Sequence, residues 1–420
     1  MKDRLIVATA VALVLPLALA GCSTKGGTET NSTSAGGIQS GTGVTDKDIT
    51  LGVMADLSGP FKSLSTAITQ GNELWAEDVN AAGGVCGRQI KLETVDHGYK
   101  ADTAKTLYPQ IEPKVLGFVQ LTGSPVMAAL GKNIETDKVT TTPASWSSEL
   151  LGNPYAMIVG TTYDVEMIDG LSYLQEKGML ADGDSVGHIY VDGEYGANGL
   201  RGSKYYAEKH KLQLHDVKIT STDTDLTNVV TGLKGQGVKV ILLTTTPKQT
   251  GSAAAANKAL GLNVPILSNN PAFDPVLLKS PAASALDKLY IVASTVPFAA
   301  DIPKAKEIAQ KYTAAGYKEP PNAGTPYGYA VGEVWGTVLK KACDNKDLTR
   351  DGIHKAMQET TSADTGDLVA ALNFGTPGAP ATRQVYVAQP DASAPGGTKY
   401  VQPLFEAELA KTYKAPHEGQ

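Results

Sequence analysis

The chain has 420 residues, 42% of them hydrophobic, and carries 37 Lys and Arg against 43 Asp and Glu. This length exceeds what one hydrophobic core usually supports, so we expect about two domains. The formal charge of −6 and the lack of a basic stretch argue against nucleic acid and anionic lipid as partners of the bulk surface.

The first 21 residues have the layout of a secretory signal. Lys2 and Arg4 precede an almost wholly apolar run over 5–20, and small residues follow. A spanning helix is disfavoured because the run is shorter than the ~20 residues needed to cross a bilayer and contains Pro16. The sequence 19–22, Leu-Ala-Gly-Cys, resembles the bacterial lipobox, so we expect cleavage before a lipidated Cys22. The alternative is an ordinary Ala-rich cleavage site with a chance cysteine.

Residues 22–47 follow as a segment dominated by Gly, Ser and Thr, which we interpret as a flexible tether. The two acyl chains of a lipidated Cys22 would anchor the protein stably at the outer face of the cell membrane. Cys86 and Cys343 remain, in an export compartment that permits disulfides, and we expect them to pair. Two buried free thiols are the alternative.

Short β-rich runs alternate with helical stretches along the body of the chain. Strands are predicted at 49–54, 89–96, 115–120, 185–191, 238–244 and 289–293, and helices at 65–82, 101–112, 124–137, 165–177, 197–209, 226–236 and 249–260. This alternation predicts parallel sheets covered on both faces, an α/β class. Two similar series, divided near residue 160, suggest two similarly built lobes.

After residue 293 the pattern changes. Helices are predicted in succession at 303–315, 326–343 and 349–359, followed by strands at 385–389 and 400–404. A helical block without strands of its own must pack on sheets already formed. We therefore expect the chain to cross between the lobes more than once.

Several strand-to-helix turns place a capping residue or glycine beside proline. Ser124-Pro125 is the clearest, because Ser124 caps the helix and Pro125 takes the first helical position. In parallel sheets such turns lie beyond the carboxyl ends of the strands, where ligands bind. Two lobes facing each other with these edges would offer amide and hydroxyl donors to a small carboxylate or amide. The other turns of this kind are Ser58-Gly59-Pro60, Thr246-Pro247, Asn270-Pro271 and Thr325-Pro326.

Enzymatic and metal chemistry lack their usual motifs. The chain has no P-loop, no Gly-x-Ser-x-Gly, no His-Glu-x-x-His and no Cys-x-x-Cys. We expect no cofactor and no metal, since the histidines show no ligand spacing; they are His97, His188, His210, His215, His354 and His417.

Three motifs carry a resemblance to a known family. They are Ile-Thr-Leu-Gly-Val with Leu-Ser-Gly-Pro at 49–60, Asn-Ala-Ala-Gly-Gly-Val-Cys-Gly-Arg at 80–88, and Asp-Gly-Glu-Tyr-Gly at 192–196. The chain resembles the type I periplasmic solute-binding proteins of branched-chain amino acid ABC importers. The resemblance implies two Rossmann-like lobes that are joined by three crossover segments and close on a ligand. It also implies a monomer that is recognised by permease subunits when closed.

The resemblance implies lobe boundaries as well. Lobe one should comprise 48–161 and 295–368, and lobe two 162–294 and 369–420, with the third crossover following Gly366, in the stretch leading to Val385. A lipoprotein of the same fold that senses a ligand for a membrane signalling partner is the alternative function.

The turns at the facing edges and the family resemblance together indicate the ligand-binding residues, with Tyr329 on the late helix. Aromatic members could instead belong to a lobe core. Tyr327 is the alternative to Tyr329. The predicted set is Ser58, Phe61, Thr122, Gly123, Ser124, Ala144, Ser145, Trp146, Tyr163, Tyr195, Asn269, Asn270 and Tyr329.

Two departures from the family pattern bear on the ligand. Ser145 and Trp146 stand where the family usually has Ala-Thr, and a bulky indole would reshape the pocket. The family's acidic partner for the ligand ammonium is missing near Asn269 and Asn270, with Asp274 the nearest acid, and burying an unpaired ammonium is costly. The expected ligand is therefore a branched-chain amino acid or a related small amide, urea-like molecule or aromatic acid.

Overall fold

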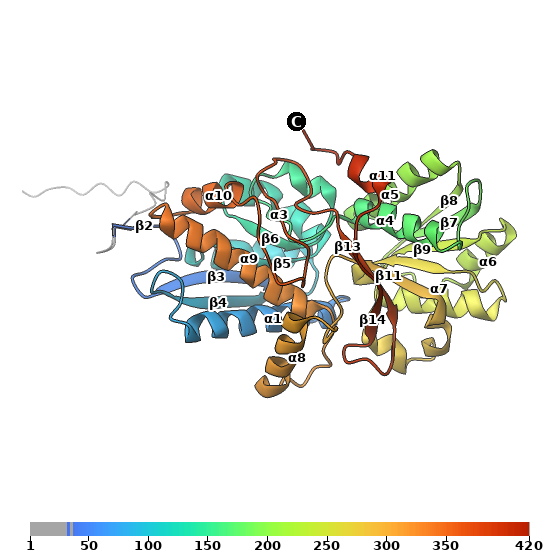
Figure 1. Ribbon diagram of the computed structural model, residues 1–420, viewed down its shortest axis with the longest axis horizontal. Helices are drawn as coiled ribbons and strands as arrows, with labels where there is room; N and C mark the ends of the chain where they lie inside the picture. The colour runs from blue at the N-terminus through green and yellow to red at the C-terminus, as the bar shows by residue number, and fades with distance from the viewer. Residues whose placement is uncertain (1–31, 34–36, 420) are drawn as a thin grey trace, which may run out of the picture.

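The computed structural model describes residues 32–33 and 37–419. The predicted signal segment, Cys22 and most of the predicted tether lie outside these residues. Within them, no helix is both long and apolar enough to cross a membrane. Figure 1 shows two α/β lobes side by side, with the colours of both chain halves present in each.

Lobe one is built on a four-stranded parallel sheet in the order β4-β3-β5-β6. Its central strands are buried, as expected for a sheet covered by helices on both faces. The strands are β3 (Asp48–Ala55), β4 (Gln89–Asp96), β5 (Gly117–Thr122) and β6 (Thr141–Ala144).

Lobe two is built on a seven-stranded sheet in the order β14-β13-β11-β10-β9-β7-β8. Strands β7 to β11 are parallel, whereas β13 runs antiparallel to β11 and β14 antiparallel to β13. The strands are β7 (Ser185–Val191), β8 (Gln213–Ile219), β9 (Val240–Thr244), β10 (Ile266–Asn269), β11 (Leu289–Ala293), β13 (Val385–Pro390) and β14 (Thr398–Phe405).

The helices lie on both sides of the sheets (Figure 1). Those with lobe one are α1 (Lys62–Ala81), α2 (Ala101–Ile111), α3 (Ser124–Thr136), α8 (Pro303–Ala315), α9 (Gly324–Asp344) and α10 (Arg350–Gln358). Those with lobe two are α4 (Tyr163–Glu176), α5 (Glu194–His210), α6 (Thr227–Gly235), α7 (Pro247–Ala259) and α11 (Glu408–Thr412). The fold class is therefore the predicted one, and the late helices α8 to α10 pack on lobe one as expected.

Helices α1 and α9 approach each other closely because glycines line the contact. A Cβ added at Gly328 would stand 2.0 Å from the backbone oxygen of Ile68, and one at Gly71 would stand 2.2 Å from that of Thr325. Gly332 lies against the ring of Trp75 in the same way. This crossing fixes the position of the first turns of α1, which reach the space between the lobes.

The tether predicted at 22–47 does not extend as far as residue 47 in the structure, because its last part is paired with lobe one. Strand β2 (Gln39–Ser40) pairs in parallel with β12 (Asp347–Leu348), and the backbone N–H of Gln39 donates to the carbonyl of Lys346 at 3.0 Å. β2 also pairs with β1 (Ser32–Thr33). Backbone pairing thus fastens a Gly- and Ser-rich stretch that composition assigns to the tether.

Three crossover segments join the lobes and touch each other. A Cβ at Gly160 in the first would meet the hydroxyl of Ser294 in the second at 2.5 Å, and Gly160 has φ +114°, a region that favours glycine. Thr161 Oγ1 donates to the carbonyl of Gln384 in the third at 2.7 Å. The three crossover segments therefore pack together as one compact hinge.

The third crossover comes later than the predicted boundary at residue 369. Val296 N–H donates to Leu368 O at 2.9 Å, Thr295 pairs with Val369, and Asn373 N–H donates to Ala381 O at 2.9 Å. These contacts keep the chain beside lobe one until shortly before β13 begins at Val385. We therefore propose a boundary near residue 382.

Cys86, in the turn after α1, is bonded to Cys343 in the last turn of α9, with Cα atoms 6.4 Å apart. This separation lies within the usual range for a disulfide. The bond would tie the far ends of the two helices that the glycine contact brings together.

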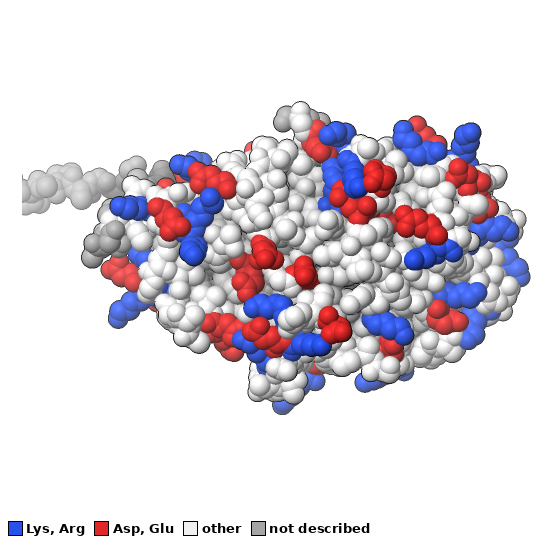
Figure 2. All heavy atoms as spheres, viewed as in Figure 1, with Lys and Arg blue, Asp and Glu red and all other residues white. Residues whose placement is uncertain are grey.

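Charged side chains of both signs are interspersed over the face shown in Figure 2, without an extended area of one sign.

Candidate functional site

An inner cavity lies between the lobes, beyond the carboxyl ends of β5 and β6. Its volume is about 20 Å³, room for roughly one water molecule. The lobes are thus closed on each other around it. The lining residues are Phe61, Leu64, Ile68, Tyr99, Thr122, Gly123, Ser124, Ala144, Trp146, Tyr163, Tyr195 and Pro271.

The polar edge of the inner cavity is the loop from Thr122 to Ser124, where β5 passes into α3. Gly123 N–H donates to Ala144 O at 3.1 Å, which joins this loop to the end of β6. Ser124 Oγ and Ser145 Oγ share a hydrogen bond of 2.6 Å, and Thr122 Oγ1 lies 3.0 Å from Ser65 Oγ. The N–H of Ser124 begins the helix and has no intrahelical acceptor. The loop therefore presents hydroxyl and amide donors suited to a carboxylate.

The remaining wall is apolar, and both lobes contribute aromatic rings to it. The ring centroids of Tyr163 and Tyr195 are 4.7 Å apart, and those of Phe61 and Tyr99 are 4.9 Å apart. Trp146 meets Tyr163 edge-on at 6.0 Å. Burial raises the pKa of both Tyr163 and Tyr195, so their phenol groups stay neutral. This wall suits the apolar part of a ligand.

Most of the Trp146 side chain packs behind the cavity wall, and little of it faces the cavity. Its side chain is 1% exposed, its Nε1–H donates to the carbonyl of Val159 at 3.0 Å, and its ring packs edge-on against Tyr327 at 4.9 Å. The indole therefore belongs largely to the core of the closed protein and fastens the first crossover.

Among the residues that the structure describes, no charged side chain lines the inner cavity. Two buried acids stand behind the wall: Asp56 Oδ2 accepts from the N–H of Phe61 at 2.9 Å, and Glu166 Oε2 on α4 accepts from Asn269 Nδ2 at 2.8 Å. Burial raises the pKa of Glu166 to about 8 against the opposing hydrogen bond from Asn269, so this carboxyl is mostly neutral at pH 7. Neither Asp56 nor Glu166 is among the residues that line the cavity, so a ligand ammonium group would meet no lining carboxylate.

Most predicted site residues meet at this cavity. Those that line it are Phe61, Thr122, Gly123, Ser124, Ala144, Trp146, Tyr163 and Tyr195, while Ser145 stands directly behind Ser124.

Four predicted residues lie elsewhere. Ser58 is exposed and hydrogen bonds to Asp96. Asn269 is buried within lobe two, where its amide also donates to the carbonyl of Tyr163 at 3.2 Å. Asn270 lines a neighbouring cavity. Tyr329 is buried but points away from the cavity and donates to Asp78 Oδ2 of α1 at 2.7 Å, because successive residues of a helix face different sides.

Sequence reasoning missed Leu64, Ile68, Tyr99 and Pro271. Leu64 and Ile68 follow Phe61 at the i+3 and i+7 spacing of one helix face, a signal that was available. Tyr99 sits at φ +61° after β4, and nothing in its local sequence indicates that it turns toward Gly123. Among residues 37–419 no cluster of three or more His, Cys, Asp or Glu is arranged to hold a metal.

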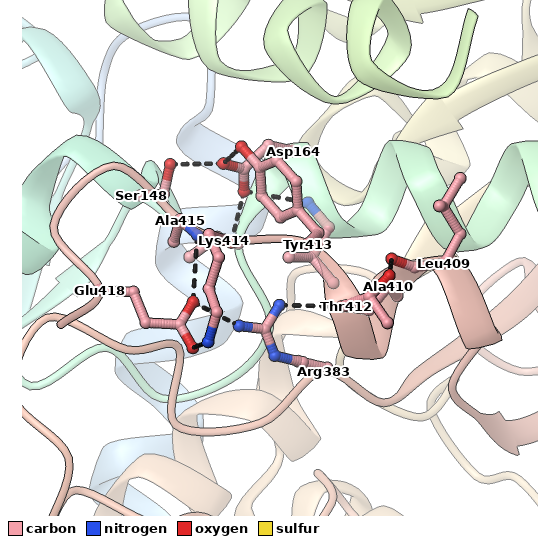
Figure 3. Close-up of polar contacts among 12 residues, drawn as sticks. Ser148, Asp164, Arg383, Leu409, Ala410, Thr412, Tyr413, Lys414, Ala415 and Glu418 are labelled. Carbon is pink, nitrogen blue, oxygen red and sulfur yellow. Dashed lines mark hydrogen bonds and ion pairs between the residues drawn. The ribbon is translucent and has the colours of Figure 1, made fainter. Parts of the chain in front are cut away.

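A buried polar network joins the lobes beside the cavity. Ser148 of lobe one donates from Oγ to Asp164 Oδ2 of lobe two at 2.6 Å and accepts from Asn198 Nδ2 on α5 at 2.6 Å. Tyr413 of the C-terminal segment donates to the same Asp164 oxygen at 2.8 Å (Figure 3). Contacts between the lobes can stabilise only the closed arrangement.

The C-terminal segment also binds the third crossover. Arg383 donates to Glu418 Oε2 at 2.7 Å and to the carbonyl of Ala410 at 3.0 Å (Figure 3). Both side chains of the ion pair are largely buried. The tail therefore braces the hinge from outside the cavity.

Comparisons with known proteins agree with this architecture. A family model described as periplasmic binding protein matches residues 48–396. A fatty acid ABC transporter substrate-binding protein from Thermomonospora curvata is 40% identical, covers 92% of this chain and 99% of its own, and superposes with a TM-score of 0.88.

Two other proteins are more distant. The Leu/Ile/Val-binding protein homolog 3 of Brucella melitensis biotype 1 is 25% identical over 336 residues, which are 76% of this chain and 89% of the relative. A branched chain amino acid ABC transporter protein from Thermus thermophilus with bound valine, 16% identical, shares the fold with a TM-score of 0.77 over 88% of this chain and 99% of its own. Two lobes around a lined cavity, a family match over most of the length and a 40% identical neighbour lead to one conclusion: the chain belongs to the periplasmic binding protein family.

Proposed function

We propose that the protein is the substrate-binding lipoprotein of an ABC-type importer and that it captures a carboxylic acid with an apolar body between its lobes. The observation that carries the ligand class is the inner cavity, where hydroxyl and amide donors at Thr122–Ser124 face an apolar and aromatic wall with no charged lining residue. The 40% identical neighbour is named as a fatty acid transporter component, which supports the same class.

The proposal departs from a zwitterionic amino acid for a physical reason. An α-ammonium group buried in this cavity would have no carboxylate beside it, and an unpaired buried charge is costly. A carboxylate can be held by hydroxyl and amide donors alone, which form strong charge-assisted hydrogen bonds. Membership in a family of binding proteins also accords with capture and release without turnover.

In operation, a ligand that contacts both lobes would shift the protein toward the closed arrangement, which the permease would recognise. The cavity in this closed structure has room for about one water. Binding therefore requires the lobes to open, or the wall side chains to move apart, before they close on the ligand.

Calorimetric titration of the delipidated protein with octanoate, leucine and octanol tests the ligand class. We expect octanoate to bind, and leucine and octanol to bind at least ten-fold more weakly. Octanol is the control for the carboxylate and leucine for the ammonium. Tighter binding of leucine than of octanoate would overturn the ligand class and leave the importer role standing.

Anchoring through Cys22 belongs to the same proposal. Mass spectrometry of the protein from cell membranes should show a diacylated N-terminal cysteine, and Cys22→Ser should release the protein from the membrane fraction. Retention of that variant in the membrane would contradict the anchor.

A further inference from the structure

Two more cavities lie between the lobes, and the three share lining residues in succession. Leu64 lines both the inner cavity and a middle cavity of about 40 Å³. Asp274 and Pro275 line both the middle cavity and an outer cavity of about 430 Å³. The cavities thus form a row that leads from the inner cavity to the protein surface.

The outer cavity is formed by both lobes. Lobe one contributes Pro60 just before α1, Thr66 in the first turns of α1 and Pro320 before α9. Lobe two contributes the short 3-10 helix η4 (Pro275–Lys279). The volume lies in the range of sites for small molecules. A hollow bounded by both lobes changes shape when they close, as a ligand site of this fold should.

The outer cavity suits an apolar part of a ligand and does not suit a second charged group on that ligand. Val276 is 61% exposed and is the one large hydrophobic side chain among residues 37–419 that is exposed. The charged lining residues balance, with Lys62 and Lys279 against Asp274 and Glu319. An unpaired apolar surface in an inter-lobe hollow gains free energy when an apolar ligand covers it.

We propose that this row of cavities is the path of the ligand's apolar tail, with the carboxylate at Thr122–Ser124 and the far end of the tail in the outer cavity. The inference rests on the proposed function and names its ligand as a straight-chain fatty acid. The inner cavity can hold little more than a head group, so a longer chain has to leave it. Leu64 is half-buried at the first junction, where a rotation of its side chain would join the inner and middle cavities.

The outer cavity therefore determines how the binding affinity depends on the length of the fatty acid. Each methylene that enters apolar surroundings should tighten binding by up to roughly four-fold. Residues at the outer end should affect long acids and leave short acids unchanged, whereas residues at the inner end should affect both.

The test compares butanoate, octanoate and dodecanoate, all below their micelle concentrations, by calorimetry on the delipidated protein. The variants are Thr66→Trp, which fills the outer cavity, and Val276→Asp, which makes an exposed position of its wall polar. Thr106→Trp is the matched control, because Thr106 is an exposed threonine on α2 that lines none of the three cavities. Thermal unfolding of each variant shows whether it is folded.

The expected result is that affinity rises with chain length in the wild type and in Thr106→Trp. In Thr66→Trp and Val276→Asp the gain from octanoate to dodecanoate should fall at least ten-fold, with butanoate binding unchanged. Equal gains in all four proteins would overturn the path, even though fatty acids bind. If no acid binds the wild type, both the path and the proposed ligand class fail. Val276→Asp decides the matter if Thr66→Trp does not fold, since Val276 is exposed.

Discussion

At the scale of single residues, the aromatic and acidic side chains near the cavity have roles that differ from their appearance in the sequence. The position of Trp146 in its loop predicts a residue that stacks on the ligand. In the structure its Nε1–H donates to Val159 O and its ring is covered by Tyr163 and Tyr327. Glu166 has the sequence context of an ordinary helical acid, yet it is wholly buried behind the cavity wall.

Trp146→Ala should destabilise the protein by about 3–5 kcal/mol, because it removes a fully buried indole and leaves a cavity beside the first crossover. Urea unfolding measures this loss. Trp146→Phe, which keeps part of the packing, should lose clearly less. Unchanged stability together with lost binding would show that the indole mainly contacts ligand.

Glu166 should make stability depend on pH. Its pKa is raised in the folded protein to about 8 from an ordinary 4.5, so its contribution is fully present below pH 4.5 and is lost as the pH rises through 8. Urea unfolding at pH 5.5 and 8.5 should show a smaller decline for Glu166→Gln than for the wild type. Glu176→Gln, an exposed acid on the same helix, should decline as the wild type does.

At the scale of elements, the crossing of α1 and α9 positions the site. Phe61 precedes α1, and Leu64 and Ile68 lie on this helix. The glycine contact between α1 and α9 sets how far these three side chains reach between the lobes. The helix pair therefore links the packing of lobe one to the shape of the cavity.

Gly328→Ala should separate α1 from α9, because the new Cβ would stand 2.0 Å from the Ile68 carbonyl oxygen. We expect a loss of about 1–3 kcal/mol in the free energy of unfolding and weaker ligand binding. Gly232→Ala on α6 is the control, since a Cβ there meets nothing within 4 Å. It should be neutral or slightly stabilising. Equal effects of the two substitutions would contradict the role of the contact.

At the scale of the whole molecule, closure depends on contacts that cross between the lobes. Asn198→Ala removes an amide that binds Ser148 of the other lobe at 2.6 Å. Its loss should cost about 1–3 kcal/mol of closure, or roughly 5- to 150-fold in ligand affinity. Asn257→Ala is the matched control, because that buried amide bonds Val264 within lobe two. It should lower stability without a comparable loss of affinity. Similar affinity losses in both variants would argue against an effect on closure.

The Cys86 to Cys343 bond fastens the two long helices of lobe one at one end, across 257 residues of sequence. Thiol titration of the denatured, unreduced protein should find neither cysteine reactive, and Cys86→Ser with Cys343→Ser should cost about 2–4 kcal/mol of stability. Two reactive thiols in the wild type would refute the bridge.

Local patterns were enough to predict much of the chain. The alternation of strands and helices, the parallel sheets and the packing of late helices on earlier strands all follow from side-chain periodicity, which each segment carries in its own sequence. In the two main sheets three strands were missed, β6, β8 and β10, and the two-residue strands β1, β2 and β12 were missed as well. β6 and β10 have four residues each, too few for a clear period, and β8 is a half-exposed edge strand.

The sequence by itself determined the fold class, the two similar strand-helix series and the helix start at Ser124-Pro125, because local propensity and turn chemistry suffice for these. The ligand role of the loop from Thr122 to Ser124 was implied by the family resemblance. Only the tertiary structure decided which side chains face the ligand space. Tyr327 and Tyr329 differ by two positions on one helix, and the packing of α9 sends one ring to Trp146 and the other to Asp78. The row of cavities from Leu64 to Val276 likewise depends on how the lobes meet, and contacts between distant segments leave no periodic signal in either one.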